Sequence, residues 1–233
     1  MEINVIASGS SGNAYFISDG VTSVLLDAGI PRSGIHAALG RKFLDIDAVL
    51  ITHSHMDHAI AAAELAKLGT NVYMSFGEAE ALGLRGHRIR YVKALERFEV
   101  GTFTIIPFNV EHDSPEPLGF LIRSGETREN LLYFTDTFYL KYQFAKVDIM
   151  ICECNHSREI IDRNLAEGTV LPSLAARLAQ SHMSIDRLSE YIRRMDKSRL
   201  REIDLVHISE SNGDPEAFTK RIMALTGAEV YPH

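Results

Sequence analysis

The sequence has few cysteines, no long apolar run and no signal-like amino terminus. Its two cysteines, Cys152 and Cys154, lie two positions apart, and so close a pair on one strand face rarely forms a good disulfide. We interpret them as small core residues in a reducing compartment. The longest apolar runs, 47–52 and 147–154, have the length of strands and fall far short of a bilayer span. We therefore expect a cytoplasmic protein that does not enter a membrane.

An excess of positive charge is also missing. The formal net charge of −7 over 233 residues argues against a protein that coats nucleic acid non-specifically, which needs a broad basic surface. The charge is compatible with a nuclease, because metal ions in an active site supply local positive charge. Two basic stretches, 85–93 and 193–201, stand out, although runs of charge are usually solvated faces. No pattern indicates an oligomeric state.

No internal repeat, low-complexity tract or linker divides the chain, and its length fits one large domain. Apolar periodicity predicts a strand-rich first block and a second block that ends in a strand and a helix. This order suggests two sheets packed between outer helices. The predicted strands are 3–8, 14–18, 23–27, 48–52, 72–75, 102–110, 119–123, 131–135, 148–154 and 203–208. The predicted helices are 31–42, 58–68, 76–84, 173–180, 185–195 and 215–225, the last two capped by Ser184 and Asp214.

The densest group of potential metal ligands follows the strand at 48–52 and reads His53-Ser54-His55-Met56-Asp57-His58. Histidines two apart do not share a helix face, so the segment differs from the helical arrangement of metalloproteases. A loop between strand and helix can instead splay the ligands. His53 and His55 can then grip one ion, while Asp57 and His58 grip a second. Imidazole and carboxylate suit zinc, manganese or iron.

A two-metal site needs further ligands, and three candidates lie at or near the ends of predicted strands: His112, Asp136 and His207. Converging loops at strand ends often build sites. Taken singly, each of these residues would be interpreted as a cap or a satisfied polar group. Together with the segment 53–58 they indicate a metal centre.

These motifs resemble the metallo-β-lactamase superfamily over nearly the whole chain. The resemblance implies an α/β fold, an αββα sandwich of two mixed β-sheets flanked by helices, in a single domain over 1–233. It also implies two divalent metal ions. By resemblance, the first ion is held by His53, His55 and His112, the second by Asp57, His58 and His207, and Asp136 bridges both. Asp27, in Leu25-Leu26-Asp27-Ala28-Gly29, resembles an early Asp that orients the histidine loop in this family.

Finer features favour one branch of the superfamily. A carboxylate at 136, rather than a cysteine, is typical of phosphodiesterases and thioesterases. The short interval from His112 to Asp136 leaves no room for the long arm of typical ribonuclease Z, and the interval to His207 excludes the large β-CASP insertion. The segments 7–13, 153–156, 181–184 and 206–209 are similar to those of YycJ-like single-domain nucleases, which are associated with DNA exonuclease activity. The resemblance implies a binuclear phosphodiesterase acting on nucleic acid.

The resemblance also suggests roles in catalysis. A hydroxide shared by the two ions would attack phosphorus, with Asp57 orienting it. By resemblance to ribonuclease Z, His182 would protonate the leaving oxygen, with Glu153 as its orienting partner. Candidate substrate contacts are His156 and the loop residues Ser10, Ser11 and Asn13. The plainer alternatives are a helix-flanking polar residue for His182, an exposed loop histidine for His156, and a tight turn for the loop.

Three other functions share this ligand set. A small-molecule cyclic phosphodiesterase has much of the same frame. A thioesterase of the glyoxalase II type has the bridging carboxylate, but no carboxylate-clamping segment stands out near the C-terminus. A metal-stabilised binding protein without activity is disfavoured, because a decayed site would be expected to lose some of its seven ligands.

Overall fold

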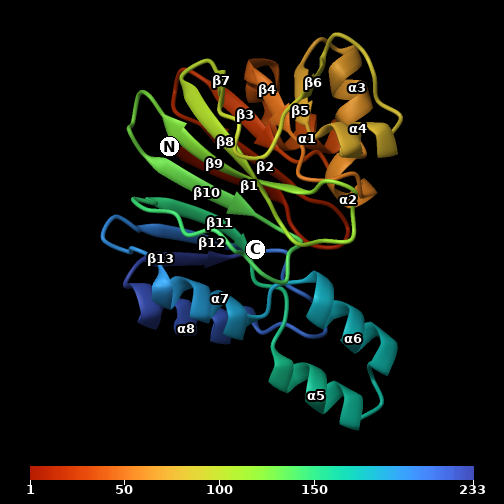
Figure 1. Cartoon of the computed structure of the whole chain (residues 1–233), viewed down its shortest axis with the longest axis vertical. Coiled ribbons are helices and arrows are strands. Elements are labelled where there is room, and N and C mark those ends of the chain that lie inside the picture. Colours follow the sequence, from red (N-terminus) through yellow and green to blue (C-terminus); the bar gives the residue numbers. More distant parts are fainter. The chain divides into compact units, whose positions relative to one another are not determined.

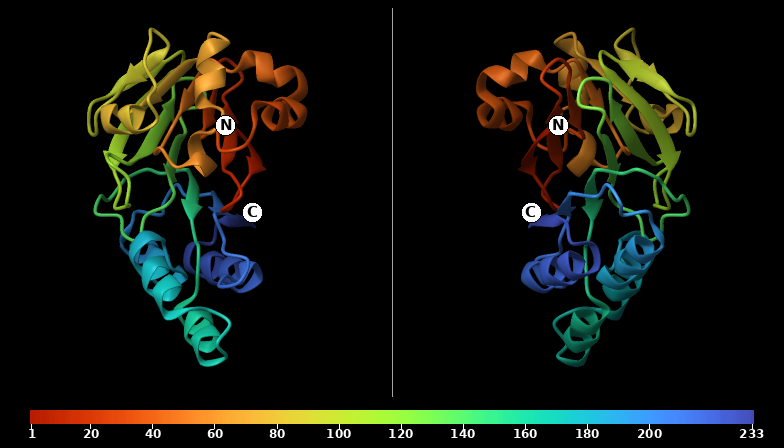
Figure 2. Two further views of the ribbon diagram at one scale, coloured as in Figure 1. Left: turned by 90° about the vertical axis from the view of Figure 1, so that its right-hand side faces the viewer. Right: turned by 90° about the vertical axis from the view of Figure 1, so that its left-hand side faces the viewer.

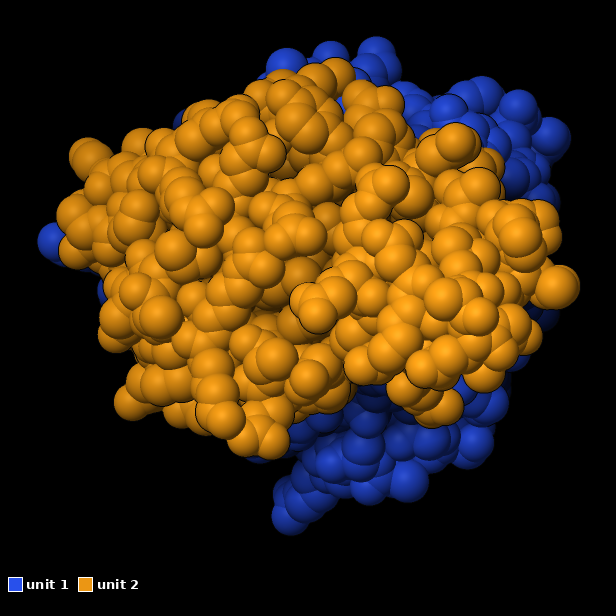
Figure 3. All heavy atoms as spheres, turned by 90° about the horizontal axis from the view of Figure 1, so that it is seen from below, with its two compact units in different colours: residues 1–109, 114–129 blue, residues 110–113, 130–233 orange.

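The computed structural model describes residues 1–233, and the chain divides into two units. Unit 1 comprises residues 1–109 and 114–129, and unit 2 comprises residues 110–113 and 130–233; Figure 3 colours them separately. The single domain expected over 1–233 stays a prediction. No helix of either unit is both long and apolar enough to cross a bilayer.

Unit 1 contains a six-stranded mixed sheet in the order β1-β2-β3-β4-β5-β6 (Figure 1). These strands are β1 (Glu2–Ala7), β2 (Ala14–Ser18), β3 (Ser23–Leu26), β4 (Ala48–Leu50), β5 (Asn71–Met74) and β6 (Ile89–Tyr91). The first three run antiparallel, whereas β3 to β6 run parallel. Strands β2, β3 and β4 are buried along their whole length, which explains their nearly unbroken apolar sequence.

Short helices connect the parallel strands of unit 1: α1 (Arg32–Leu39), η1 (Gly40–Asp45), α2 (Met56–Ala59), α3 (Ala62–Lys67) and α4 (Phe76–Ala81). Ile35 and Leu65 of these helices join Leu25 and Val49 of the sheet in one apolar core cluster. Unit 1 also holds three antiparallel strands, β7 (Phe98–Val100), β8 (Phe103–Asn109) and β9 (Leu118–Ser124).

Unit 2 is built on four parallel strands: β10 (Asn130–Phe134), β11 (Ile149–Glu153), β12 (Glu202–Val206) and β13 (Glu229–Pro232). Its helices are α5 (Arg158–Ala166), α6 (Pro172–Ser181), α7 (Ile185–Arg194) and α8 (Pro215–Thr226). Helices α5 and α6 lie side by side in both views of Figure 2. Because all four strands are parallel, their carboxyl ends meet at one edge of the sheet, where sites are commonly built.

The structure corrects several predicted elements. The helix expected at 58–68 is two short helices, because the Ala61 N–H donates to the Ala28 carbonyl (2.9 Å) across the break. The helix expected at 31–42 ends at Leu39, and Gly40, with φ 56°, leads into a 3-10 turn. Four elements were not predicted: β6, β7, α5 and β13. The expected caps are confirmed, since Ser184 accepts from Arg187 N–H and Asp214 from Ala217 N–H.

Candidate metal centre

The histidine segment of unit 1 leaves the carboxyl end of β4 and runs into α2. His53 and His58 are buried, and their rings lie 4.1 Å apart between centroids. The His55 ring lies 4.8 Å from that of His53 in an edge-on arrangement. The side chain of Asp57 is 30% exposed and its Oδ2 lies 3.6 Å from His58 Nε2. All four predicted ligands of unit 1 therefore gather in one segment, His53 and His55 before α2 and Asp57 and His58 within it.

Asp27, at the end of β3, fixes two of these imidazoles. Its Oδ2 lies 2.8 Å from His58 Nδ1, and both its oxygens accept from Thr52 Oγ1 (3.0 and 2.9 Å). Since the Thr52 hydroxyl donates to Asp27, its oxygen is left to accept from His53 Nδ1, 2.9 Å away. Both histidines thus carry their proton on Nδ1 and a lone pair on Nε2, the tautomer that a metal ligand requires.

The loop before β2 is hydrogen-bonded to the histidine segment through Asn13. Asn13 is fully buried; its backbone N–H donates to the Asp57 carbonyl (2.8 Å), and its side-chain Nδ2 lies 3.1 Å from His58 Nε2. Gly29 packs so closely that an added Cβ would lie 1.6 Å from the Asp57 carbonyl oxygen, so only glycine fits there. Ser10 and Ser11, by contrast, are exposed.

The predicted ligands of unit 2 come together at the carboxyl ends of β10 and β12. Asp136 Oδ2 lies 3.8 Å from His112 Nε2, and Asp136 Oδ1 lies 3.4 Å from His207 Nδ1. Asp136 and His207 have φ values of 48° and 54°, and Asp27 of unit 1 has 55°. Residues other than glycine rarely adopt this left-handed backbone conformation, and such strained residues cluster at functional sites.

Glu153, at the end of β11, is fully buried and accepts hydrogen bonds from four groups of unit 2. Its Oε1 lies 2.6 Å from His182 Nδ1 and 3.1 Å from His207 Nδ1, while its Oε2 accepts from the N–H groups of Thr137 and Met183 (3.0 Å each). Burial raises the pKa of Glu153, but the charge and hydrogen bond of His182 and the hydrogen bond of His207 together bring the pKa below its usual value. Burial lowers the pKa of His182, and the Glu153 carboxylate raises it overall.

The donor chemistry of these residues fits divalent metal ions. In unit 2, one candidate ligand atom from each of Asp136, Glu153, His182 and His207 can be chosen so that all lie within 4.8 Å of one another. Glu153 engages His207 through Nδ1, which places the His207 lone pair on Nε2. Carboxylates and imidazoles in such a group suit zinc, manganese or iron.

The structure also shows the surroundings of His156 and of the two cysteines. His156 is buried rather than exposed, and it lies in a pocket between helices of unit 2. Cys152 and Cys154 are buried free thiols, which confirms that they are core residues. Burial raises the pKa of both thiols, so neither supplies a thiolate at neutral pH.

Glu78 is a structural residue of the site that the sequence did not reveal. It is fully buried in α4; its Oε2 accepts from the Ser54 N–H and its Oε1 from the Glu116 N–H, both at 2.7 Å. Glu78 therefore anchors the backbone of the histidine segment. A glutamate in a short helix carries no motif that could have signalled this role.

Residues 7–137 match the family described as the metallo-beta-lactamase superfamily. The chain belongs to this superfamily. Membership, together with the metallo-β-lactamase-fold neighbours, confirms the predicted α/β fold with two mixed sheets flanked by helices, and the prediction of a metal-dependent hydrolase.

Similar proteins lie within the superfamily. Exodeoxyribonuclease WalJ of Streptococcus pneumoniae serotype 2 (strain D39 / NCTC 7466) is 28% identical over 230 residues, covering 91% of this chain and 83% of WalJ. Exodeoxyribonuclease YycJ of Bacillus anthracis is 25% identical over 263 residues, covering 94% of this chain and 98% of YycJ. The crystal structure of the metallo-β-lactamase-fold protein YhfI from Bacillus subtilis matches with a TM-score of 0.73 at 17% identity. The match covers 99% of this chain and 95% of the YhfI chain. The predicted resemblance to the YycJ-like branch is confirmed.

Proposed function

We propose that this metallo-β-lactamase superfamily member hydrolyses phosphodiester bonds with two divalent ions, and that DNA is its substrate. The observation that carries the proposal is the buried Asp136, whose Oδ2 lies 3.8 Å from His112 Nε2 and whose Oδ1 lies 3.4 Å from His207 Nδ1. A carboxylate at the shared position is typical of the phosphodiesterase and thioesterase branches. The two relatives named exodeoxyribonucleases favour DNA as the substrate.

The ligand assignment follows the order of ligands in the superfamily and is part of the proposal. His53, His55 and His112 would hold one ion, His58, Asp57 and His207 the other, and Asp136 would contact both. When bound, the ions would lower the pKa of a water and neutralise charge that develops on a phosphate oxygen. Zinc or manganese is expected, and iron has the same ligand preferences.

The remaining steps belong to side chains of the chain itself. Asp57, partly exposed, would orient the attacking water. His182 is 12% exposed, and the Glu153 carboxylate holds its Nδ1, so its Nε2 is the atom that can carry a proton to the leaving oxygen. The Glu153 carboxylate raises the pKa of His182, which favours the protonated imidazole.

Replacement of Asp136 by Ala tests the shared ligand. We expect hydrolysis of bis-p-nitrophenyl phosphate to fall to background and the bound metal, measured by atomic emission, to drop below that of the wild type. The matched control is Asp45→Ala, since Asp45 is an exposed residue of η1 without a proposed role as ligand. Full activity of the Asp136→Ala variant would overturn the ligand assignment.

The substrate is tested with a panel of phosphodiesters. Protein loaded with zinc or with manganese is assayed on single- and double-stranded DNA, RNA, cyclic nucleotides and a glutathione thioester. The proposal expects mononucleotides released from DNA. Turnover of cyclic nucleotides without DNA hydrolysis would indicate a small-molecule phosphodiesterase, and turnover of the thioester alone would indicate a thioesterase.

A further inference from the structure

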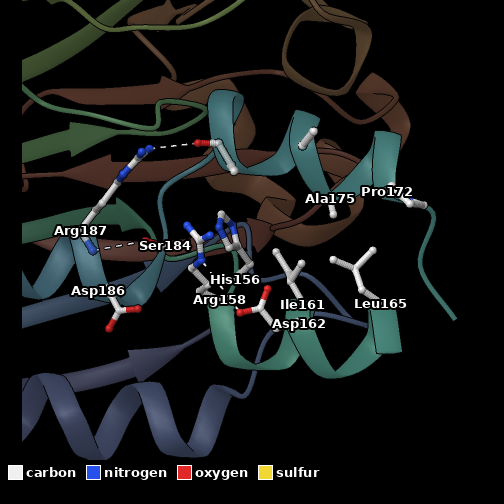
Figure 4. Close-up of a pocket in the computed structure, with 12 residues that line it drawn as sticks. His156, Arg158, Ile161, Asp162, Leu165, Pro172, Ala175, Ser184, Asp186 and Arg187 are labelled. Carbon is white, nitrogen blue, oxygen red and sulfur yellow. Dashed lines mark hydrogen bonds and ion pairs between the residues drawn. The ribbon is translucent and has the colours of Figure 1, made fainter. Parts of the chain in front are cut away.

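Unit 2 contains a cavity of about 400 Å³ bounded by α5, α6 and the start of α7. Figure 4 shows apolar residues at one end, Ile161, Leu165 and Ala175, and polar residues at the other, His156 and Arg187 among them. The volume falls within the roughly 300–1,000 Å³ of small-molecule pockets. No residue of this cavity is a proposed metal ligand.

The apolar end is a preformed surface rather than a loose surface groove. Ile161 and Ala175 are buried and form a small apolar cluster with Val170, against which Leu165 packs. These side chains come from both α5 and α6, so the two helices present one apolar wall. Such a wall can hold a flat, weakly polar ring without desolvating any charge.

The polar end centres on His156, which is 4% exposed and whose Nδ1 has no hydrogen-bond partner. Burial lowers its pKa to about 4, so the imidazole is neutral at pH 7 and carries one N–H. A buried N–H without an acceptor is costlier than a buried lone pair, so the proton is favoured on Nε2. Unsatisfied buried groups in a native protein call for an explanation, and an absent ligand supplies one.

The charges around the cavity are largely engaged by the protein. Arg187 donates to the carbonyls of Phe138 and Ala179 (3.1 and 3.0 Å), and Asp186 pairs with Arg221 (2.7 Å). Arg158 is 4.0 Å from Asp162, and its side chain is 78% exposed. The interior therefore suits a neutral ligand, whereas Arg158 can stack on a ring or contact a phosphate.

The backbone around His156 in the cavity wall is hydrogen-bonded to the segment that follows His182. His156 pairs with Ser184 in a parallel bridge, and its carbonyl accepts from the Ile185 N–H (2.9 Å). The preceding Asn155 N–H donates to the Met183 carbonyl (2.8 Å). The cavity wall and the proposed proton donor are thus held by one short ladder of hydrogen bonds.

We propose that this cavity binds the nucleobase of the nucleotide whose phosphate is hydrolysed. The base would lie against Ile161 and Ala175, and one of its ring N–H or amino groups would donate to the Nδ1 lone pair of His156. A nucleobase combines a flat ring with a neutral N–H donor, the two features that this cavity matches. The inference rests on the proposed function, and it assigns this cavity to the base of the DNA substrate.

The test is calorimetric titration of the metal-loaded full chain with thymidine 5′-monophosphate, 2′-deoxyadenosine 5′-monophosphate and the base-free deoxyribose 5-phosphate. We expect at least one nucleotide to bind about tenfold more tightly than deoxyribose 5-phosphate. Ala176→Phe, at an exposed position of α6 that lines the cavity, should fill the space and abolish this difference. His156→Leu should reduce it. Ser173→Phe, exposed on the same helix but outside the cavity lining, should preserve it.

Equal affinities for the nucleotides and the base-free phosphate in the wild type would overturn the inference, as would a difference that survives in Ala176→Phe. The titration measures binding and not turnover, so it separates the two proposals. A wild-type protein that prefers nucleotides but hydrolyses no phosphodiester would contradict the proposed function and support the cavity's preference for a base.

Discussion

Glu153 uses both of its carboxylate oxygens as acceptors. Oε1 serves two imidazoles, those of His182 and His207, and Oε2 serves two backbone N–H groups. A carboxamide cannot copy this arrangement, because its NH₂ group would face donors whichever way the amide is turned. Glu153 is therefore a positioning residue that fixes the tautomers of His182 and His207 together.

Replacing Glu153 by Gln should lower kcat on bis-p-nitrophenyl phosphate by about 10–100-fold, the usual effect of removing a partner behind a metal ligand. Metal content should fall in parallel, because His207 loses its orientation. Glu167→Gln, the same change at an exposed position, is the control and should behave like the wild type. Unchanged kcat in Glu153→Gln would contradict the positioning role.

His182 lies in the same group, and its role is separable from that of a ligand. If His182 donates the proton, His182→Ala should lower kcat by about 100-fold or more while metal content stays near normal. The measurement is steady-state kinetics beside atomic emission on the same sample. A collapse of metal content would make His182 a ligand and would require a new assignment for His207.

The helix caps are the features of single elements that the sequence predicts best, because capping uses side-chain chemistry within a few residues. Asp214 accepts from the Ala217 N–H (3.0 Å) at the start of α8, far in sequence from any proposed ligand except His207. Asp214→Ala should lower the free energy of unfolding by about 1 kcal/mol in urea titrations. Asp214→Asn keeps an acceptor oxygen and should recover most of it. Equal losses in both variants would point to the charge rather than the cap.

Elements that rely on contacts distant in sequence were harder to predict. Strands with a buried apolar run, such as β2, were placed to the residue, since burial on both faces marks them directly. Helix α5 was missed because Ile161 is its one buried residue, which leaves almost no apolar stripe to detect. Strand β6 was hidden in the basic stretch 85–93, where only Ile89 is buried within the strand.

Within the site, the candidate ligands could be picked out from the sequence, but their geometry could not. The segment 53–58 stands out by its density of potential ligands. His112, Asp136 and His207 stand out only in combination with that segment, and family resemblance alone assigns them to individual ions. Nothing in the sequence signals the left-handed backbone at Asp27, Asp136 and His207, because tertiary contacts impose it. The anchoring role of Glu78 likewise depends on a contact 24 residues away, with the Ser54 N–H.

At the scale of the whole molecule, metal ions that bind the folded chain and not the unfolded chain should raise its free energy of unfolding. A ligand present at 100 times its Kd stabilises the native state by about 2.7 kcal/mol. For a chain of this length, each kcal/mol raises Tm by about 2–4 °C, so zinc or manganese should raise Tm by about 5–11 °C over the chelator-treated protein. Differential scanning calorimetry measures the shift. It should vanish in Asp136→Ala and persist in Asp45→Ala, a change at an exposed residue of η1. A metal-dependent shift of full size in Asp136→Ala would mean that the stabilising ions bind elsewhere.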